Sequence, residues 1–332
     1  MVDLRSDTVT RPTPAMRRAM ADADVGDDAY GEDPTVRRLE ETYAEIVGKE
    51  AGLFVPSGTM ANQLSLRVLG RPGTTILCGA GSHIAAFESG AAGLNASAQL
   101  VTLDDGDGML DPADVRFHVE AAAHHRVPPS LVCVENTAMV AGGAPWDLDR
   151  LRAVEAVGVP VHLDGARLFN AVVATGISAA DYAAGATVVW SALTKGLGAP
   201  VGSVMAGSAE VVERLRVGRH HLGGQMRQAG VLAAAGLVAL DQMVDRLAED
   251  HARAAVLAAA VAERWPGAVD PDSVRTNLVV FRHPDPDALL AHLAGAGVLG
   301  GTIAPGVVRL VTHHDVDDDG IEQARKALAS AP

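Results

Sequence analysis

Short apolar segments alternate with helical segments through the first two thirds of the chain, and this pattern restricts the fold more than any other feature. The segments expected to form strands are residues 99–103, 130–134, 159–163, 187–190 and 201–205. Helical stretches such as 112–124 and 148–157 separate them. Strands that are apolar at every position are buried on both faces. The chain is therefore predicted to be an α/β protein with a mostly parallel sheet sandwiched by helices.

The pattern changes near Gln225, where an Ala- and Leu-rich segment carries charged residues at helical spacing. We expect one long helix here, bridging two domains. The elements expected after Trp265 are a strand at 278–281, a helix at 286–294, a strand at 307–312 and a helix at 319–328. These elements make a small α+β domain. The predicted division is a large domain at residues 1–245 and a small C-terminal domain at residues 246–332.

Charge and cysteine content narrow the expected partners and compartment. The 27 Lys and Arg residues against 41 Asp and Glu residues give a formal net charge of −14, which disfavours nucleic acid and anionic membranes as partners. The first seven residues alternate charges where a signal peptide requires an apolar core. The uncharged stretch 288–308 contains Pro305 and several glycines, so we expect helix, turns and strand rather than a membrane span. Cys78 and Cys133 lie in apolar runs, as buried thiols of a reducing compartment do, and we expect a cytoplasmic protein.

Two local patterns suit an anionic ligand. Ser57, Gly58 and Thr59 form a turn before an amphipathic helix, where free backbone N–H groups and hydroxyls favour a phosphate. An ordinary helix cap is the commoner explanation of such a turn taken alone. Asp164 follows an apolar strand, and ligands bind at the carboxyl ends of strands in open α/β sheets. The alternative is that Asp164 only caps the following helix.

Lys195 is a single lysine among small and apolar residues, just past an expected strand. Burial lowers the pKa of a lysine and supplies the neutral amine that Schiff-base chemistry needs, whereas a lysine that reaches the surface is the alternative. Asp164 and Lys195 are 31 positions apart, which fits strand, helix and strand and places both at one edge of one sheet. A phosphate turn, an acid for a pyridine nitrogen and a lysine for an aldehyde together predict pyridoxal 5'-phosphate (PLP) as the cofactor.

Two further residues carry weaker signals. His83 follows a short apolar strand and suits stacking on a flat cofactor or acting as a base, although a loop histidine without a catalytic task is the alternative. Arg309 lies in an apolar strand, where its guanidinium needs an anion, either a substrate carboxylate or a structural Asp or Glu. Adjacent histidine pairs point in different directions, so no metal site is predicted.

Six motifs, in order, resemble those of the L-threonine aldolases, and the similarity spans essentially the whole chain. They are DLRSDTVT at 3–10, GDDAYGEDPT at 26–35, FVPSGTMANQ at 54–63, HLDGARLFN at 162–170, KGLGAPVGS at 195–203 and MRQAG at 226–230. The resemblance implies a PLP-dependent enzyme of the aspartate aminotransferase fold, fold type I of the PLP-dependent transferases. It also implies a homotetramer with active sites at subunit interfaces.

The resemblance implies the following cofactor contacts. Lys195 would form the Schiff base, Asp164 would pair with the pyridine nitrogen, and His83 would lie over the ring. The groups implied to hold the phosphate are Ser57, Gly58 and Thr59, with Arg227 from a neighbouring subunit.

The resemblance also implies an amino-acid substrate and a reaction. Ser6, Arg167 and Arg309 would bind the substrate carboxylate, with Arg167 also touching the cofactor oxygen. His83 or His125 would take the β-hydroxyl proton, directly or through a water. The expected reaction is reversible cleavage of L-threonine, L-allo-threonine and related β-hydroxy-α-amino acids to glycine and an aldehyde.

Two other functions stay open from the sequence. A β-eliminating lyase or an aminotransferase uses the same fold, and the cofactor contacts alone do not select which bond of the substrate Cα breaks. A homologue that binds PLP or a partner without turnover is the other alternative. Retention of Lys195, Asp164 and Arg309 argues against it, because a chain free of catalytic duty has no need to keep a partly buried lysine.

Overall fold

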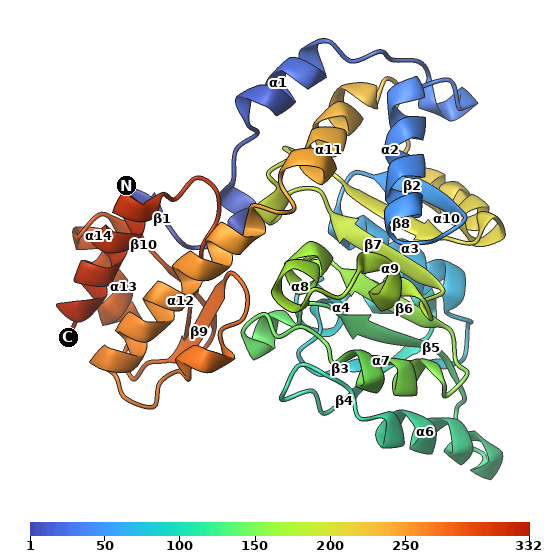
Figure 1. The fold of residues 1–332 in the computed structure, drawn as a ribbon. Helices are drawn as coiled ribbons and strands as arrows, with labels where there is room; N and C mark the ends of the chain where they lie inside the picture. The colour runs from blue at the N-terminus through green and yellow to red at the C-terminus, as the bar shows by residue number, and fades with distance from the viewer.

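A seven-stranded mixed sheet forms the centre of the larger part of the molecule (Figure 1). The computed structural model describes residues 1–332. The strands are β2 (Ala51–Val55), β3 (Thr75–Gly79), β4 (Gln99–Leu103), β5 (Pro129–Glu135), β6 (Val161–Gly165), β7 (Val188–Ala192) and β8 (Ser203–Gly207). Their order is β2-β8-β7-β6-β5-β3-β4, and only β8 runs antiparallel to its neighbours. The predicted α/β fold with a mostly parallel sheet is confirmed.

Helices cover both faces of this sheet, which explains its uninterrupted apolar strands. Along β5, Val132 and Val134 face the largest core cluster, whereas Leu131 and Cys133 face another cluster on the opposite side. The helices are α1 (Pro14–Ala21), α2 (Pro34–Ile46), α3 (Gly58–Leu69), α4 (His83–Ala86), α5 (Ala91–Ala96), α6 (Pro112–Ala121), α7 (Leu148–Glu155), α8 (Leu168–Thr175), α9 (Ala179–Ala183), α10 (Ala209–His221) and α11 (Gly230–Gln242). Cys78 and Cys133 are both buried and free.

A second, smaller part contains both chain termini (Figure 1). Its antiparallel sheet has the order β11 (Gly301–Ala304), β12 (Val307–Val311) and β9 (Leu278–Arg282). Helices α12 (Leu247–Arg264), α13 (Pro286–Gly295) and α14 (Asp318–Ala329) accompany it. The N-terminal strand β1 (Val2–Asp3) pairs in parallel with β10 (Val298–Leu299), and Val2 and Leu4 are buried in the same core cluster as α12 and α14. The division at residue 246 stays a prediction, but these first residues pack with the C-terminal part.

Two sequence expectations are wrong in detail, one at the junction of the two parts and one within the small part. The single long helix expected from Gln225 is two helices, α11 and α12, interrupted at residues 243–246. Met243 and Leu247 still pack in the large core cluster, whereas Ala254 packs in the small one, so the chain turns where it passes between the cores. The stretch 288–308 also contains the strands β10 and β11, because β10 pairs with β1 and β11 with β12.

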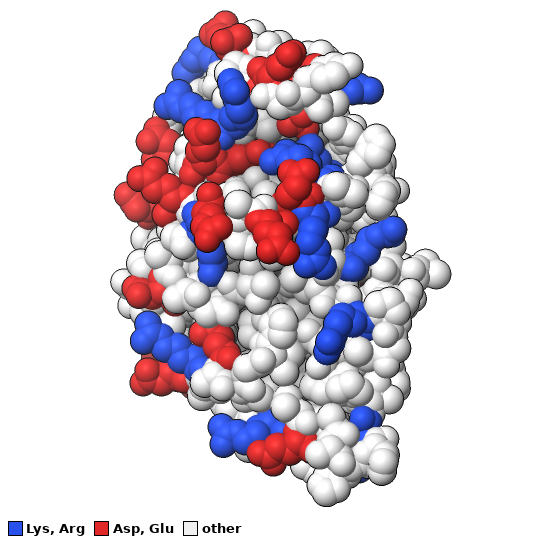
Figure 2. Space-filling view, turned by 90° about the vertical axis from the view of Figure 1, so that its right-hand side faces the viewer, with Lys and Arg blue, Asp and Glu red and all other residues white.

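Surface charge, helix character and possible metal ligands are relevant to the partners expected from the sequence. On the face drawn in Figure 2, acidic and basic side chains are interspersed around a broad area without charged residues. None of the helices combines the length and apolar character needed to cross a bilayer. The chain also has no group of three or more His, Cys, Asp and Glu side chains placed to hold a metal ion.

Candidate active site

Asp164 and Lys195 lie at the same edge of the central sheet. Asp164 is near the end of β6 and is in register with Trp190 of the parallel strand β7, which Lys195 follows after a short turn. The backbone carbonyl of Lys195 accepts a hydrogen bond from Thr10 Oγ1 at 2.8 Å. Burial, and then the nearby Arg167 guanidinium, lower the pKa of Lys195 to about 8. A substantial fraction of this amine is therefore neutral near physiological pH.

The turn before α3 lies beside the same strand end. Ser57 caps the helix by accepting the N–H of Met60 at 3.2 Å, and the N–H groups of Gly58 and Thr59 have no partner in the chain. A Cβ at Gly58 would lie only 2.4 Å from the Trp190 ring, so the turn can approach β7 only with glycine there. The helix begins where the sequence predicted and offers free N–H groups to an anion.

The side chain of Asn62 connects this helix to the sheet edge. Its Nδ2 donates to Asp164 Oδ2 at 2.9 Å and to Glu88 Oε1 at 2.7 Å. Its Oδ1 accepts from Trp190 Nε1 and from His162 Nε2, each at 2.8 Å. Asn62 was not predicted as a site residue. An amide side chain inside an amphipathic helix was nevertheless a recognisable sign that a buried hydrogen bond would form there.

His83 begins α4 between two carboxylates. Its ring Nδ1 lies 2.8 Å from Glu88 Oε1, and this hydrogen bond raises the pKa of His83.

Glu135 is the second of these carboxylates. The backbone N–H of His83 donates to Glu135 Oε2 at 2.9 Å, while Glu135 Oε1 accepts the N–H of Met139. Burial, and then the Asp164 carboxylate, raise the pKa of Glu135 to about 7. The ring of Phe87 lies 5.7 Å from that of His83, centroid to centroid. Glu88 and Glu135 were not predicted, because only the folded chain brings them to His83.

Two guanidinium groups lie close to this edge. Arg167 donates to both oxygens of the buried Asp7 carboxylate, from Nε at 2.8 Å and from Nη2 at 2.7 Å. Arg309 makes no ion pair: its Nη2 donates to the carbonyl of Arg5 at 3.0 Å, and its buried Nε has no partner. Burial and then Arg167 lower the pKa of Arg309. Arg309 is therefore the cation available to an incoming carboxylate, and Ser6 lies on the same N-terminal segment as Arg5.

Two residues predicted for the site lie elsewhere in this chain. His125 is exposed and precedes β5, whereas Asp164 is paired with Glu135 at the far end of that strand. The strand has seven residues, so it spans roughly 20 Å and separates the two groups. Arg227 is on the surface, with its side chain 66% exposed and 3.5 Å from Asp27. Their predicted roles stay predictions that require a neighbouring subunit.

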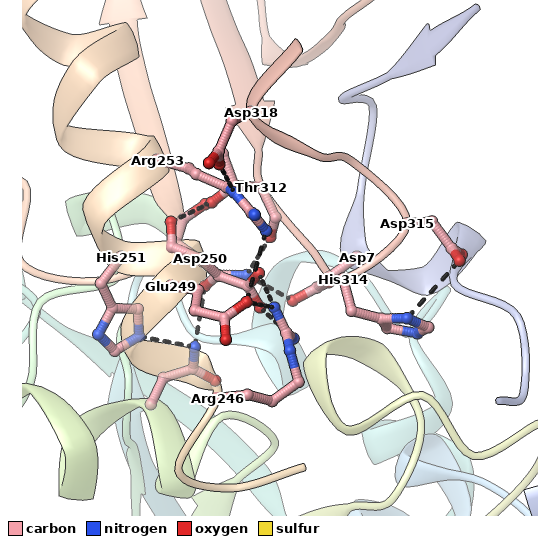
Figure 3. Close-up of polar contacts among 12 residues, drawn as sticks. Asp7, Arg246, Glu249, Asp250, His251, Arg253, Thr312, His314, Asp315 and Asp318 are labelled. Carbon is pink, nitrogen blue, oxygen red and sulfur yellow. Dashed lines mark hydrogen bonds and ion pairs between the residues drawn. The ribbon is translucent and has the colours of Figure 1, made fainter. Parts of the chain in front are cut away.

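The site lies where the two parts of the molecule meet. Asp7 Oδ2 also accepts from Asn277 Nδ2 at 3.1 Å, and Asn277 is linked through Asn170 to His251 of α12. Nearby, Arg246 donates to both oxygens of Asp250, at 3.0 and 2.6 Å (Figure 3). Polar contacts from both parts of the chain thus hold the segment that carries Asp7.

Comparison with known proteins now assigns the family. A family model described as β-eliminating lyase matches residues 3–284. Low-specificity L-threonine aldolase 1 of Arabidopsis thaliana is 40% identical over 343 aligned residues, which cover 99% of this chain and 96% of that protein. The chain belongs to the β-eliminating lyase family. Its resemblance to the threonine aldolases, inferred from the six motifs, is confirmed.

Solved structures show that this family member shares its fold with PLP enzymes. Leishmania major threonine aldolase has a TM-score of 0.83 at 22% identity, covering 99% of this chain and 98% of that one. A serine palmitoyltransferase variant from S. paucimobilis, with bound PLP–myriocin aldimine, has a TM-score of 0.77 at 15% identity, covering 99% and 86%. Because these sequence identities are low, the two structures establish the fold of this chain and not its substrate.

The residues of this family member fit PLP at the sheet edge. Gly58 and Thr59 offer unpaired N–H groups to a phosphate. Asp164 keeps acceptor capacity for a ring N–H beyond its bonds from Asn62 and from the N–H of Ala166. Lys195 supplies an amine whose pKa is lowered to about 8. These three kinds of group are the ones that a phosphate, a pyridine nitrogen and an aldehyde require.

Proposed function

We propose that this chain is a PLP-dependent aldolase that cleaves L-threonine, L-allo-threonine and related β-hydroxy-α-amino acids to glycine and an aldehyde. The observation that carries the proposal is the position of Lys195, whose pKa is lowered to about 8, and of Asp164 at the ends of adjacent strands. The 40% identity to a low-specificity L-threonine aldolase over the full chain supports the choice of substrate.

Four groups would hold the cofactor. Lys195 would present a neutral amine to the aldehyde of PLP, and Asp164 would hold a proton on its ring nitrogen. Ser57 and the free N–H groups after it would bind the phosphate, with Arg227 of a neighbouring subunit completing the contact. When bound, PLP accepts the electron pair that Cα keeps as the Cα–Cβ bond breaks.

The substrate is oriented by the N-terminal segment and the small sheet. Arg309, which has no carboxylate partner of its own, binds the substrate carboxylate together with Ser6. Arg167 supports them, held in place by its two bonds to Asp7. Since the charge of Arg167 is balanced by Asp7, the half-buried Arg309 guanidinium is the uncompensated positive charge where one carboxylate enters.

Proton transfer falls to a histidine. His83 donates from Nδ1 to Glu88, which leaves Nε2 free to accept the β-hydroxyl proton when the ring is neutral. His125 is the second candidate base, and it can act only if another subunit brings it to the site. We also propose a homotetramer, in which His125 and Arg227, both exposed in this chain, would reach the active site of a neighbouring subunit. The proposed location is cytoplasmic, which the two buried free cysteines support.

The test is aldehyde release from L-threonine and L-allo-threonine by the PLP-loaded chain beside its Lys195→Ala variant. We expect glycine and acetaldehyde in equal amounts from the native chain only. Pyruvate and ammonia from L-serine, without aldehyde from threonine, would assign β-elimination instead. Amino-group transfer to a 2-oxo acid would assign an aminotransferase, and a visible cofactor band without turnover would assign a binding protein.

A further inference from the structure

Asn62 is buried and uses all of its hydrogen-bonding capacity. Only 1% of the residue is exposed, in the second turn of α3. Its two N–H bonds point to two different carboxylates, Asp164 and Glu88, and its carbonyl oxygen accepts from Trp190 and His162. An amide has two donors and two acceptor lone pairs, so no further partner is possible.

The orientation of this amide is fixed by its neighbours. The indole N–H of Trp190 can only donate, so the atom facing it has to be Oδ1 of Asn62. His162 Nε2 then has to carry a hydrogen to bond the same oxygen. Burial lowers the pKa of His162 to about 4, so the ring is neutral and is held in this single tautomer. Trp190 and His162 therefore force the NH₂ group of Asn62 toward the two carboxylates.

The two carboxylates serve opposite ends of the site. Asp164 has two donors within the chain, the Asn62 amide at Oδ2 and the N–H of Ala166 at Oδ1. Glu88 accepts from Asn62 and His83 at Oε1, and from Gln63 Nε2 at Oε2. Two carboxylates that share one amide group repel each other, and the hydrogens donated between them offset part of this repulsion. Asn62 is the only side chain that donates to both.

We propose that Asn62 is a positioning residue that couples the two ends of the active site, Asp164 at the cofactor ring nitrogen and the Glu88–His83 pair at the proton-transfer end. This inference rests on the proposed function for the meaning of the two ends. By donating one hydrogen to each carboxylate, Asn62 fixes the directions of both and offsets part of their mutual repulsion. A change at Asn62 therefore alters cofactor binding and His83 titration together.

The neighbouring residue Gln63 provides a matched control. It lies on the same helix, is also buried and also ends in an amide, but it donates to Glu88 and not to Asp164. Asn62→Asp keeps the volume and the accepting oxygen while removing donors. Gln63→Glu makes the same chemical change beside Glu88 alone. The comparison separates coupling of both ends from a general effect of adding a buried carboxyl group.

Two readouts are measured on the PLP-loaded full chain. One is the PLP dissociation constant, from the visible absorbance band between about pH 6 and about pH 8, and the other is the His83 titration, from NMR of ¹³C-labelled histidine. For Asn62→Asp we expect PLP affinity to fall about tenfold across this range, because Asp164 loses the amide N–H that fixes its direction and gains a second acid beside it. We also expect its His83 pKa to rise. Gln63→Glu should raise the His83 pKa and leave PLP affinity within about twofold of the native value.

Three results would overturn the inference. They are native PLP affinity at all pH values in Asn62→Asp, an unmoved His83 titration in the same variant, and equal loss of PLP affinity in Gln63→Glu. Trp190→Phe serves if Asn62→Asp does not fold, because it removes the N–H that orients the amide and should shift both readouts; no shift in either contradicts the coupling. Neither readout uses threonine cleavage. A native chain that binds PLP but does not cleave threonine would therefore overturn the proposed function alone.

Discussion

At the scale of single residues, Lys195 shows how the fold places a charged group where ionisation is costly. Its backbone adopts a left-handed conformation, with φ of 59°, and burial lowers its pKa to about 8. The folded chain therefore binds this proton less tightly than the unfolded chain, in which lysine has a pKa near 10.4. Ionisation of Lys195 opposes folding below about pH 8, and the opposition fades as the pH rises toward the unfolded value.

Lys195→Met is accordingly expected to stabilise the PLP-free protein while abolishing turnover. Methionine keeps the length of the side chain and removes the charge, so the free energy of unfolding at pH 7 should rise by about 3 kcal/mol. Urea unfolding of both PLP-free proteins measures this difference, which should shrink toward about pH 10. A Lys195→Met protein that is less stable than native at pH 7 would show that the carboxylates around Lys195 outweigh its desolvation.

Glu88 is expected to set the acid limb of the activity profile through His83. The hydrogen bond that His83 donates to Glu88 is the main cause of the raised pKa of His83. Because the proposed base is the neutral ring, activity should appear as the pH rises through that raised pKa. Glu88→Gln removes the negative charge, so the acid limb of kcat/KM should move down by about one pH unit while kcat falls. An acid limb that does not move would exclude His83 as the titrating base.

At the scale of elements, the close approach of α3 to β7 depends on one glycine. A Cβ at Gly58 would lie 2.4 Å from Trp190, the side chain that also orients Asn62. Gly58→Ala should lower the free energy of unfolding by about 1–3 kcal/mol and weaken PLP binding, because helix and indole have to separate. Gly93→Ala in α5 is the control, since its Cβ meets nothing within 4 Å. Calorimetry and PLP titration of both variants make the comparison, and equal effects would contradict the steric argument.

Elements were more predictable than contacts from this sequence. Strands β4 to β8 and helices α13 and α14 lie where apolar runs and helical spacing placed them, to within a few residues. The break between α11 and α12 was not predicted from the sequence. It lies where the chain passes from one core cluster to the other, and local helix propensity carries no signal for it. Strand β10 was missed because its partner β1 is almost 300 residues away in the chain. Local patterns carry no information on such distant partners.

The same distinction applies to the candidate site. Lys195, Asp164 and the turn at Ser57 each follow or begin a regular element, so their shared edge could be inferred from strand order. Asn62 and Glu88 acquire their roles from partners on other elements. The buried ion pair of Asp7 and Arg167 spans 160 positions and has no local signature.

At the scale of the whole molecule, the N-terminal segment joins the two core clusters. Leu4 donates to the carbonyl of Leu299 at 2.7 Å and accepts from Val311 at 2.8 Å, within the small part. A few residues later Asp7 pairs with Arg167, and Thr10 bonds the carbonyl of Lys195. A short segment thus links the small sheet to the edge of the large one that carries the candidate site. Loss of the Asp7 carboxylate should therefore lower the free energy of unfolding of the whole protein.

Asp7→Asn tests this link through pH. Burial opposes ionisation of Asp7, but Arg167 outweighs it and holds the pKa of Asp7 well below its usual value. The pair therefore stabilises the fold above about pH 4, the unfolded pKa of the carboxyl, and its contribution is lost as the pH falls through the lower folded value. At pH 7, Asp7→Asn leaves the buried Arg167 without its anion and should lower the free energy of unfolding by about 3 kcal/mol.

A surface carboxylate gives the control for this prediction. Glu213 is 72% exposed on its side chain and lies 4.0 Å from Arg216, so Glu213→Gln should change stability by less than about 0.5 kcal/mol at any pH. Urea unfolding of the three proteins at pH 7 and near pH 3 measures the differences. The gap between native and Asp7→Asn should narrow in acid, because near pH 3 the carboxyl of Asp7 takes up a proton in the unfolded chain while it stays ionised in the folded one. A gap that stays constant with pH would mean that the segment is held by its backbone contacts to the small sheet and not by the ion pair.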